Sequence, residues 1–157
     1  MVVVPKRVKF WPGSVQRELY DLDDDVRNHI FQALSDAKFG VKSDATKPFG
    51  EDDRLAKVMK IVKDSKDGNT YRGVYTIEFP EAIWVLDVFA KKSTRGIATP
   101  KLDIDRIVKR LKSLRDYRKS PEGKAEVTAL LVELGTRLKA AQQDKEKGHA
   151  TRKPKGS

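Results

Sequence analysis

The sequence predicts an α+β fold in which a small antiparallel sheet carries helices on one face. Three observations predict this class. Residues 2–10 mix β-branched residues with cations, as a first strand does. Helical signals follow over residues 14–37, and three more strands and a helix succeed one another between residues 55 and 117. The expected order is therefore β-α-α-β-β-β-α, with a C-terminal helical extension and one sheet face left open for binding.

Two helices are expected before the second strand. Ser14 caps a short segment that ends at Tyr20. An acidic run then precedes the second helix, which suits the positive end of its dipole, and Gly40 ends it. The residues that this helix buries recur at three-and-four spacing and are Val26, Ile30, Phe31, Leu34 and Ala37.

The middle of the chain reads as a loop followed by three strands. Residues 41–53 are polar, and strands are expected at residues 55–62, 70–79 and 82–90, joined by ordinary hairpin turns. The last of these strands is apolar on both faces and is therefore an interior strand. Alternation in the middle strand points Arg72 away from the aromatic side, onto the open face.

The C-terminal third is helical and then basic. A helix is expected at residues 103–117, and Ser120 with Pro121 begins another, whose leucine stripe needs a surface to pack on. We expect that surface to be the chain's own domain. The predicted division is a domain at residues 1–118, a C-terminal helix at 119–143 and a disordered basic tail at 144–157.

Composition restricts the partners and the chemistry. The 157 residues carry a net charge of +10 with a pI near 9.7, which favours a nucleic acid as the partner. No apolar run approaches the roughly 20 residues of a membrane span, and the N-terminus is not a signal peptide, so we expect a cytoplasmic protein. The absence of cysteine excludes thiolate metal sites. The acidic run reads as a helix start, so neither a metal nor another cofactor is expected.

Several cations are predicted to converge at one edge of the sheet. Arg72 begins a strand, Lys91 and Lys92 follow the last strand, and Lys60 lies on the strand before. An arginine fork binds phosphate oxygens at two points and stays charged. A lysine crowded by other cations has a depressed pKa, so Lys91 or Lys60 can act as a general acid or base near neutrality.

Two segments resemble phage-related toxins of the RelE/HigB (RelE/ParE) superfamily. These are Thr70-Tyr71-Arg72-Gly73-Val74-Tyr75 and Phe89-Ala90-Lys91-Lys92-Ser93, supported by residues 96–105. The resemblance implies the toxin of a type II toxin–antitoxin pair. It implies a metal-independent endoribonuclease that cuts mRNA on the ribosome, inhibits translation and is silenced by a cognate helix-turn-helix antitoxin.

The resemblance also implies roles for particular residues. The family's strand arginine falls on Arg72 and its basic pair on Lys91 and Lys92, and Lys60 on the strand before completes the predicted catalytic set. The RNA-binding set is predicted from basic side chains on adjoining elements of a strongly basic chain, and is Arg95, Lys57, Arg106, Lys109 and Arg110. Two positions depart from the pattern, since related sequences often carry histidine at Asp87 and glutamine at Ala90. The missing histidine keeps an alternative open, a ParE-like inhibitor of DNA gyrase that cleaves no RNA. A plain nucleic-acid-binding module is the third possibility.

Overall fold

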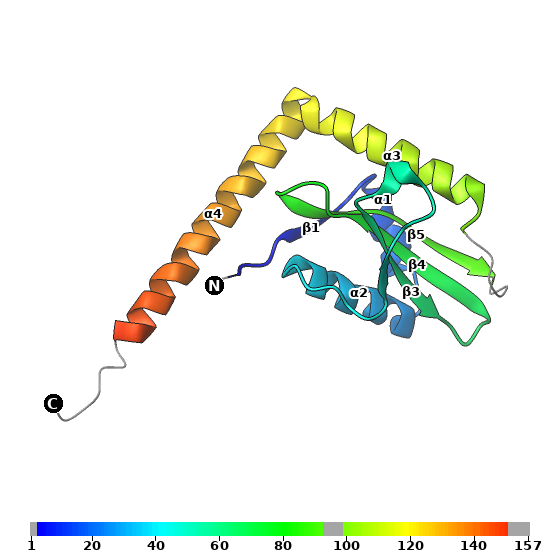
Figure 1. Cartoon of the computed structure of the whole chain (residues 1–157), viewed down its shortest axis with the longest axis horizontal. Coiled ribbons are helices and arrows are strands. Elements are labelled where there is room, and N and C mark those ends of the chain that lie inside the picture. The colour runs from blue at the N-terminus through cyan, green and yellow to red at the C-terminus, as the bar shows by residue number, and fades with distance from the viewer. Residues whose placement is uncertain (1–2, 93–98, 151–157) are drawn as a thin grey trace.

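A five-stranded sheet forms the centre of the molecule (Figure 1). The computed structural model describes residues 3–92 and 99–150, with the backbone alone for residues 92, 149 and 150. The strands lie in the order β1-β5-β4-β3-β2, and β1 is parallel to β5 while the other neighbours are antiparallel. Their bounds are β1 Arg7–Phe10, β2 Thr46–Pro48, β3 Val58–Asp64, β4 Asn69–Thr76 and β5 Ala82–Lys92.

The predicted α+β class and element order are confirmed. The helices are α1 Ser14–Tyr20, α2 Asp24–Lys38, the 3₁₀ turn η1 Asp53–Leu55, α3 Lys101–Lys119 and α4 Pro121–Ala150. The structure adds the short strand β2 within the segment expected to be a loop. Strand β5 lies between β1 and β4, as its apolar character on both faces predicted.

Helices α1 and α2 cover one face of the sheet. Val15 and Leu19 of α1 and Ile30 of α2 are fully buried in the core cluster beneath them. Gly73 of β4 lies directly under Ile30, where an added Cβ would approach the isoleucine to 3.1 Å. Glycine at this position therefore lets α2 sit close to the sheet.

Helix α3 packs on the opposite face, which corrects the expectation that all helices share one face. Ile107, Leu111 and Leu114 are buried against a second core cluster that includes Trp84 and Leu86 of β5. The physical reason is that β5 presents large apolar side chains on both faces, so each face needs a cover.

A β-bulge in β5 changes which residues face α3. Val74 pairs with Asp87 while Tyr75 pairs with Val85, so Leu86 is an extra residue in the ladder. Leu86 and Asp87 therefore both face α3, Leu86 within the apolar cluster and Asp87 through an ion pair with Arg106 of that helix. Beyond the bulge, every second residue, including Phe89 and Lys91, continues on that face.

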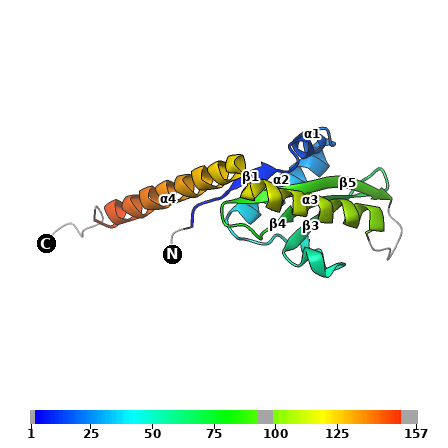
Figure 2. The ribbon, with the colours of Figure 1, turned by 90° about the horizontal axis from the view of Figure 1, so that it is seen from above.

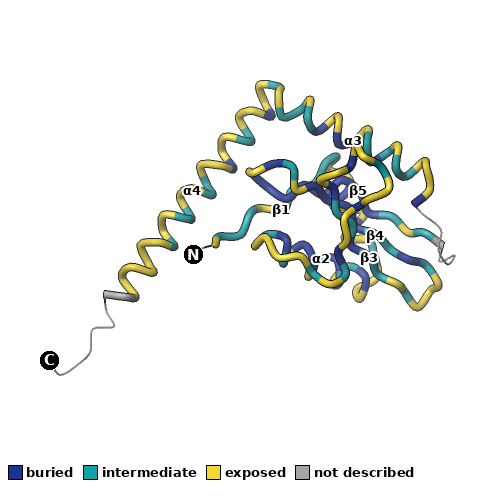
Figure 3. Tube along the Cα trace, viewed as in Figure 1, coloured by how far each residue is buried: buried dark blue, intermediate teal, exposed yellow. Residues whose placement is uncertain are grey.

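Helix α4 begins against the domain and then extends away from it (Figures 1 and 2). Leu130 is buried, and Glu126 and Glu133 pair with Lys9 and Arg7 of the edge strand β1. From residue 131 to residue 148, its residues are exposed or half-buried (Figure 3). The leucine stripe thus docks on the domain only in part. The helix also continues to Ala150, so the expected boundary at residue 143 lies within it.

The corner between α3 and α4 requires glycine at position 123. An added Cβ would lie against the carbonyl oxygen of Tyr117 and 2.9 Å from the Cα of Arg118, both backbone atoms that cannot swing aside. We expect Gly123→Ala to lower the free energy of unfolding by about 1–3 kcal/mol, the usual effect of overpacking. Thermal unfolding together with amide exchange in α4 measures this.

Gly135→Ala is the matched control, since nothing lies within 4 Å of an added Cβ there. Alanine is the better helix former by about 1 kcal/mol, so this variant should be as stable as the wild type or slightly more so. Equal destabilisation by both variants would contradict a tight corner at Gly123.

No helix within residues 3–92 and 99–150 is long and apolar enough to cross a membrane.

Candidate phosphate-binding site

Three of the predicted cations come from adjacent strands and face the same side of the sheet. Lys60 of β3 pairs in register with Val74, two residues from Arg72 in β4, and Lys91 of β5 pairs with Thr70, also two residues from Arg72. Residues in register share a face, and so do residues two apart on a strand. We call Lys60, Arg72 and Lys91 the cationic cluster. It lies on the α3 face, beyond the N-terminal end of that helix.

A carboxylate from a loop lies among these cations. Glu51 lies between β2 and η1, and its Oε1 forms an ion pair with the Lys60 Nζ at 2.7 Å. Its other oxygen accepts a hydrogen bond from the backbone N–H of Thr99 at 3.0 Å, and the Thr99 hydroxyl donates to the first oxygen at 3.2 Å. Glu51 and Thr99 therefore connect the loop, β3 and the start of α3 at a single point.

Arg72 joins this network through Thr99. Its Nη1 donates a hydrogen bond to the Thr99 hydroxyl, and Thr99 itself is only 4% exposed. The Nε of Arg72 is buried and has no hydrogen-bond partner among the described residues. Since a buried donor without a partner is unfavourable, this face of the guanidinium is suited to an incoming acceptor such as a phosphate oxygen.

The electrostatics of the cluster shift two pKa values. Burial, followed by the positive charge of Arg72, lowers the pKa of Lys91 below 10.5. Burial by itself would raise the pKa of Glu51, but hydrogen bonds from Lys60 and Thr99 outweigh it and hold that pKa below 4.5. At neutral pH, Glu51 is therefore an anion, and Lys91 loses its proton more readily than a lysine in water.

Two of the predicted RNA-binding arginines are engaged inside the fold. Arg106 pairs with Asp87 at 2.7 Å and with Asp103 at 2.7 Å. Arg110 pairs with Asp87 at 3.1 Å and donates to the carbonyl oxygen of Leu86 at 2.8 Å. The Asp87 side chain is 3% exposed. Asp87 thus anchors α3 to the bulge of β5.

The other predicted residues lie apart from the cluster or outside the description. Lys57 lies just before β3, and Lys109 lies about 12 Å along α3 from its first residue; both are exposed. Lys92 ends β5, with its side chain outside the described part, and Arg95 lies outside the described residues altogether.

Sequence reasoning missed Glu51 and Thr99. Glu51 follows Gly50 in a polar loop, where a glutamate is predicted to be exposed to solvent. Thr99 did carry a signal, because it immediately precedes Pro100, the residue before the first turn of α3. A threonine at that place indicates a helix start, but not a bond to an arginine 27 positions earlier in the chain.

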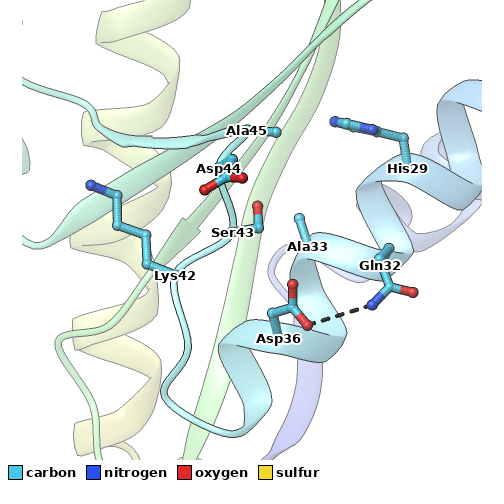
Figure 4. Close-up of a pocket in the computed structure, with 8 residues that line it drawn as sticks. All are labelled: His29, Gln32, Ala33, Asp36, Lys42, Ser43, Asp44 and Ala45. Carbon is cyan, nitrogen blue, oxygen red and sulfur yellow. Dashed lines mark hydrogen bonds between the residues drawn. The ribbon is translucent and has the colours of Figure 1, made fainter.

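A separate hollow lies beside α2, away from the cationic cluster (Figure 4). Its lining is His29, Gln32, Ala33, Asp36, Lys42, Ser43, Asp44 and Ala45. The lining holds two carboxylates, Asp36 and Asp44, and one lysine, Lys42, so it would repel a phosphate more than attract it. Across the described parts of the chain, no three histidine, aspartate or glutamate side chains are grouped so as to hold a metal ion.

The geometry of the cluster fits recognition of a phosphodiester. It offers a guanidinium fork, two ammonium groups, a hydroxyl and a backbone N–H close to a helix N-terminus, which are the donors that bind phosphate oxygens. One ammonium has a pKa displaced towards neutrality, as proton transfer requires.

A comparison with protein-family models matches residues 17–112 to the family described as Phage derived protein Gp49-like (DUF891). The match covers more than half of the chain and includes Lys60, Arg72 and Lys91. No curated protein matches the chain. The matched family is a RelE/HigB-like toxin family of toxin–antitoxin systems.

Proposed function

The chain belongs to the phage-derived Gp49-like family, and on that premise we propose that it is the toxin of a toxin–antitoxin pair. We propose further that it is an endoribonuclease that cleaves mRNA on the ribosome and thereby inhibits translation. Its partners are then the ribosome-bound mRNA and a cognate antitoxin that silences it.

One observation carries the nuclease proposal, namely that Lys60, Arg72 and Lys91 share one face of the sheet. Strands hold these cations in fixed directions, and a fixed array stabilises charge that develops in a transition state without reorganising. The net charge of +10 adds a general attraction to RNA.

The proposed reaction uses the RNA's own 2′-hydroxyl. Its oxygen attacks the adjacent phosphorus, the bond from phosphorus to the 5′-oxygen breaks, and a 2′,3′-cyclic phosphate and a 5′-hydroxyl are formed. The 2′-hydroxyl proton passes to solvent, and the 5′-oxygen takes a proton from Lys91. Arg72 binds the two non-bridging oxygens as negative charge builds on them. Lys91 then regains a proton from the solvent, so atoms and charge balance over the cycle.

The experiment is cleavage in a translation extract. Purified protein is added to an extract programmed with a defined mRNA, and the ends are mapped by primer extension. We expect cuts within the translated region that disappear when initiation is blocked. Intact mRNA combined with normal translation would overturn the proposal.

The alternative of a gyrase inhibitor is favoured by one observation. Asp87 stands where related toxins often have histidine, and its carboxylate is engaged in ion pairs with Arg106 and Arg110. A supercoiling assay with purified gyrase separates the two functions. Inhibition of supercoiling without any RNA cleavage decides for the alternative, and salt-dependent RNA binding without either effect decides for a binding module.

The lowered pKa of Lys91 makes a testable prediction for the pH profile. Because the group donates a proton, cleavage should fall as the pH rises through its pKa, which lies below the 10.5 of a free lysine. Lys91→Arg keeps the charge but does not lose its proton in this range, so it should slow cleavage by about 100-fold and flatten the alkaline limb. An unchanged alkaline limb would remove Lys91 from proton transfer.

A further inference from the structure

The carboxylate of Glu51 makes the contacts that a substrate phosphate would make. It accepts from the Lys60 ammonium, the Thr99 backbone N–H and the Thr99 hydroxyl, and that hydroxyl in turn accepts from Arg72. The groups of this network come from β3, from β4 and from Thr99, which precedes the N-cap residue of α3. Together they form a pocket of donors for one anion, which Glu51 fills.

Glu51 can leave this position without disturbing the core. It lies in the short loop between β2 and η1, and the flanking anchors Phe49 and Leu55 are each 1% exposed. Gly50, at φ +68°, forms the bend that turns the chain from Phe49 into the loop. The loop is thus fixed at both ends, while Glu51 keeps an exposed backbone and a side chain that is 21% exposed.

An unliganded cluster of three cations would be electrostatically unfavourable, which gives the internal anion a physical reason. Like charges a few ångströms apart repel, and Lys60 and Arg72 both contribute to the lowered pKa of Lys91. A neighbouring carboxylate offsets that repulsion. A phosphate group offers the same kind of acceptor oxygens, so both anions compete for the same donors.

We propose that Glu51 is a built-in competitor that occupies the phosphate position of the empty site and is displaced when an RNA phosphodiester binds. This inference deepens the proposed function and rests on it for the identity of the ligand. Displacement exchanges one internal ion pair for contacts to the RNA, so the glutamate lowers the affinity for RNA.

A purely structural role for Glu51 predicts the opposite result. If the carboxylate serves only to hold Lys60 and Thr99 in place, its removal loosens the donors and weakens RNA binding. The sign of the change in affinity therefore separates a competitor from a support.

The test measures binding of a short 2′-O-methyl RNA, which cannot be cleaved because its 2′-hydroxyls are blocked. Fluorescence anisotropy with the full chain gives the Kd for the wild type and for Glu51→Gln. We expect Glu51→Gln to bind at least about fivefold more tightly, because an ion pair no longer has to be broken. Unchanged or weaker binding overturns the proposal.

Asp53→Asn is the matched control for net charge. Asp53 is exposed in the next turn of the same segment and, among the described residues, has no ion pair with the cluster. It should change the Kd by less than about twofold, as expected for a surface charge. Equal strengthening by both variants would show a general charge effect and overturn the proposal.

A second measurement uses the wild type and so does not depend on a variant's folding. The side-chain carboxyl carbon of Glu51 is followed by NMR while the 2′-O-methyl RNA is added. We expect its signal to move to the position of a solvated glutamate at saturation, and a signal that stays in place contradicts displacement. Neither measurement needs cleavage. If Glu51→Gln binds RNA more tightly but the protein cleaves no RNA, the nuclease proposal is wrong and the competitor role of Glu51 stands.

Discussion

Arg72→Ala is expected to reduce the rate of RNA cleavage by at least about 100-fold, the loss typical when a preorganised donor to transition-state charge is removed. The guanidinium is the only group of the cationic cluster that can bind two phosphate oxygens at once. Its Nε has no hydrogen-bond partner within the described residues, so this N–H can donate to a substrate oxygen. The measurement is the single-turnover rate on a defined mRNA in the translation extract.

The fold should survive this substitution. Arg72 lies at the α3 face of β4 but outside the apolar clusters, and its described hydrogen bond is to Thr99. Loss of that bond costs about 1 kcal/mol. Arg72→Lys retains the charge without the planar fork and should give an intermediate rate, because a single ammonium cannot bind two oxygens in parallel.

Arg7→Ala is the control for loss of a positive charge. Arg7 is also a strand arginine, but it lies on β1 at the far side of β5 from β4, with a side chain 61% exposed and paired with Glu133. Its removal should change the rate by less than about twofold. If Arg72→Ala cleaves at the rate of Arg7→Ala while both remain folded, the cationic cluster is not the active centre.

The position of Arg72 was predictable because a strand has a strict period of two. Tyr71 and Tyr75 of β4 pack in the cluster beneath α1 and α2, and Val74 packs beneath α3. Arg72 thus faces away from the tyrosines, as expected. The alternation fails only where the strand ends at Thr76, since Phe79 lies beyond it and packs on the α3 side.

The face of Lys91 was harder to predict. In an unbroken strand, Lys91 would share a face with Val85, which packs beneath α1 and α2. The bulge at Leu86 shifts the phase by one residue and brings Lys91 to the side of Arg72. Nothing in the apolar run of β5 marks the extra residue, because both of its faces are buried.

The placement of the helices depends on information that periodicity does not contain. A stripe such as Ile107, Leu111 and Leu114 shows that α3 buries one side, but not which face of the sheet receives it. The end of α4 was misjudged because its lysines suggested disorder. Alanine, glutamine, glutamate and lysine are good helix formers, and the helix continues through them to Ala150.

Arg118→Met is expected to destabilise the protein by about 3–5 kcal/mol at neutral pH, as removal of one partner from a buried ion pair does. The Glu81 residue is completely buried, and Arg118 donates to both of its oxygens, at 2.9 and 2.7 Å. Arg118 also lies 3.9 Å from the ring centroid of Phe79. In the variant, the indole N–H of Trp84 is the one remaining side-chain donor described for this carboxylate.

A second arginine of the same helix provides the control. Arg115→Met removes the other bidentate arginine of α3, which binds Glu78 at 2.9 and 2.7 Å. That pair is more exposed, at 43% for the arginine and 25% for the glutamate, so its loss should cost less than about 1 kcal/mol. Urea unfolding of both variants measures the difference, and equal losses would contradict a decisive role for burial.

The pH dependence distinguishes a lost ion pair from lost packing. In the wild type, burial alone would raise the pKa of Glu81, but Arg118 and Trp84 hold it below 4.5, so this stabilisation is present above that pH and is lost as the pH falls through the lowered pKa. Without Arg118, burial raises the pKa of Glu81, and the folded state then binds a proton more tightly than the unfolded chain. The difference between wild type and Arg118→Met should therefore shrink as the pH falls from the raised pKa of Glu81 in the variant to its lowered pKa in the wild type. A difference that stays constant with pH would instead indicate lost packing against Phe79.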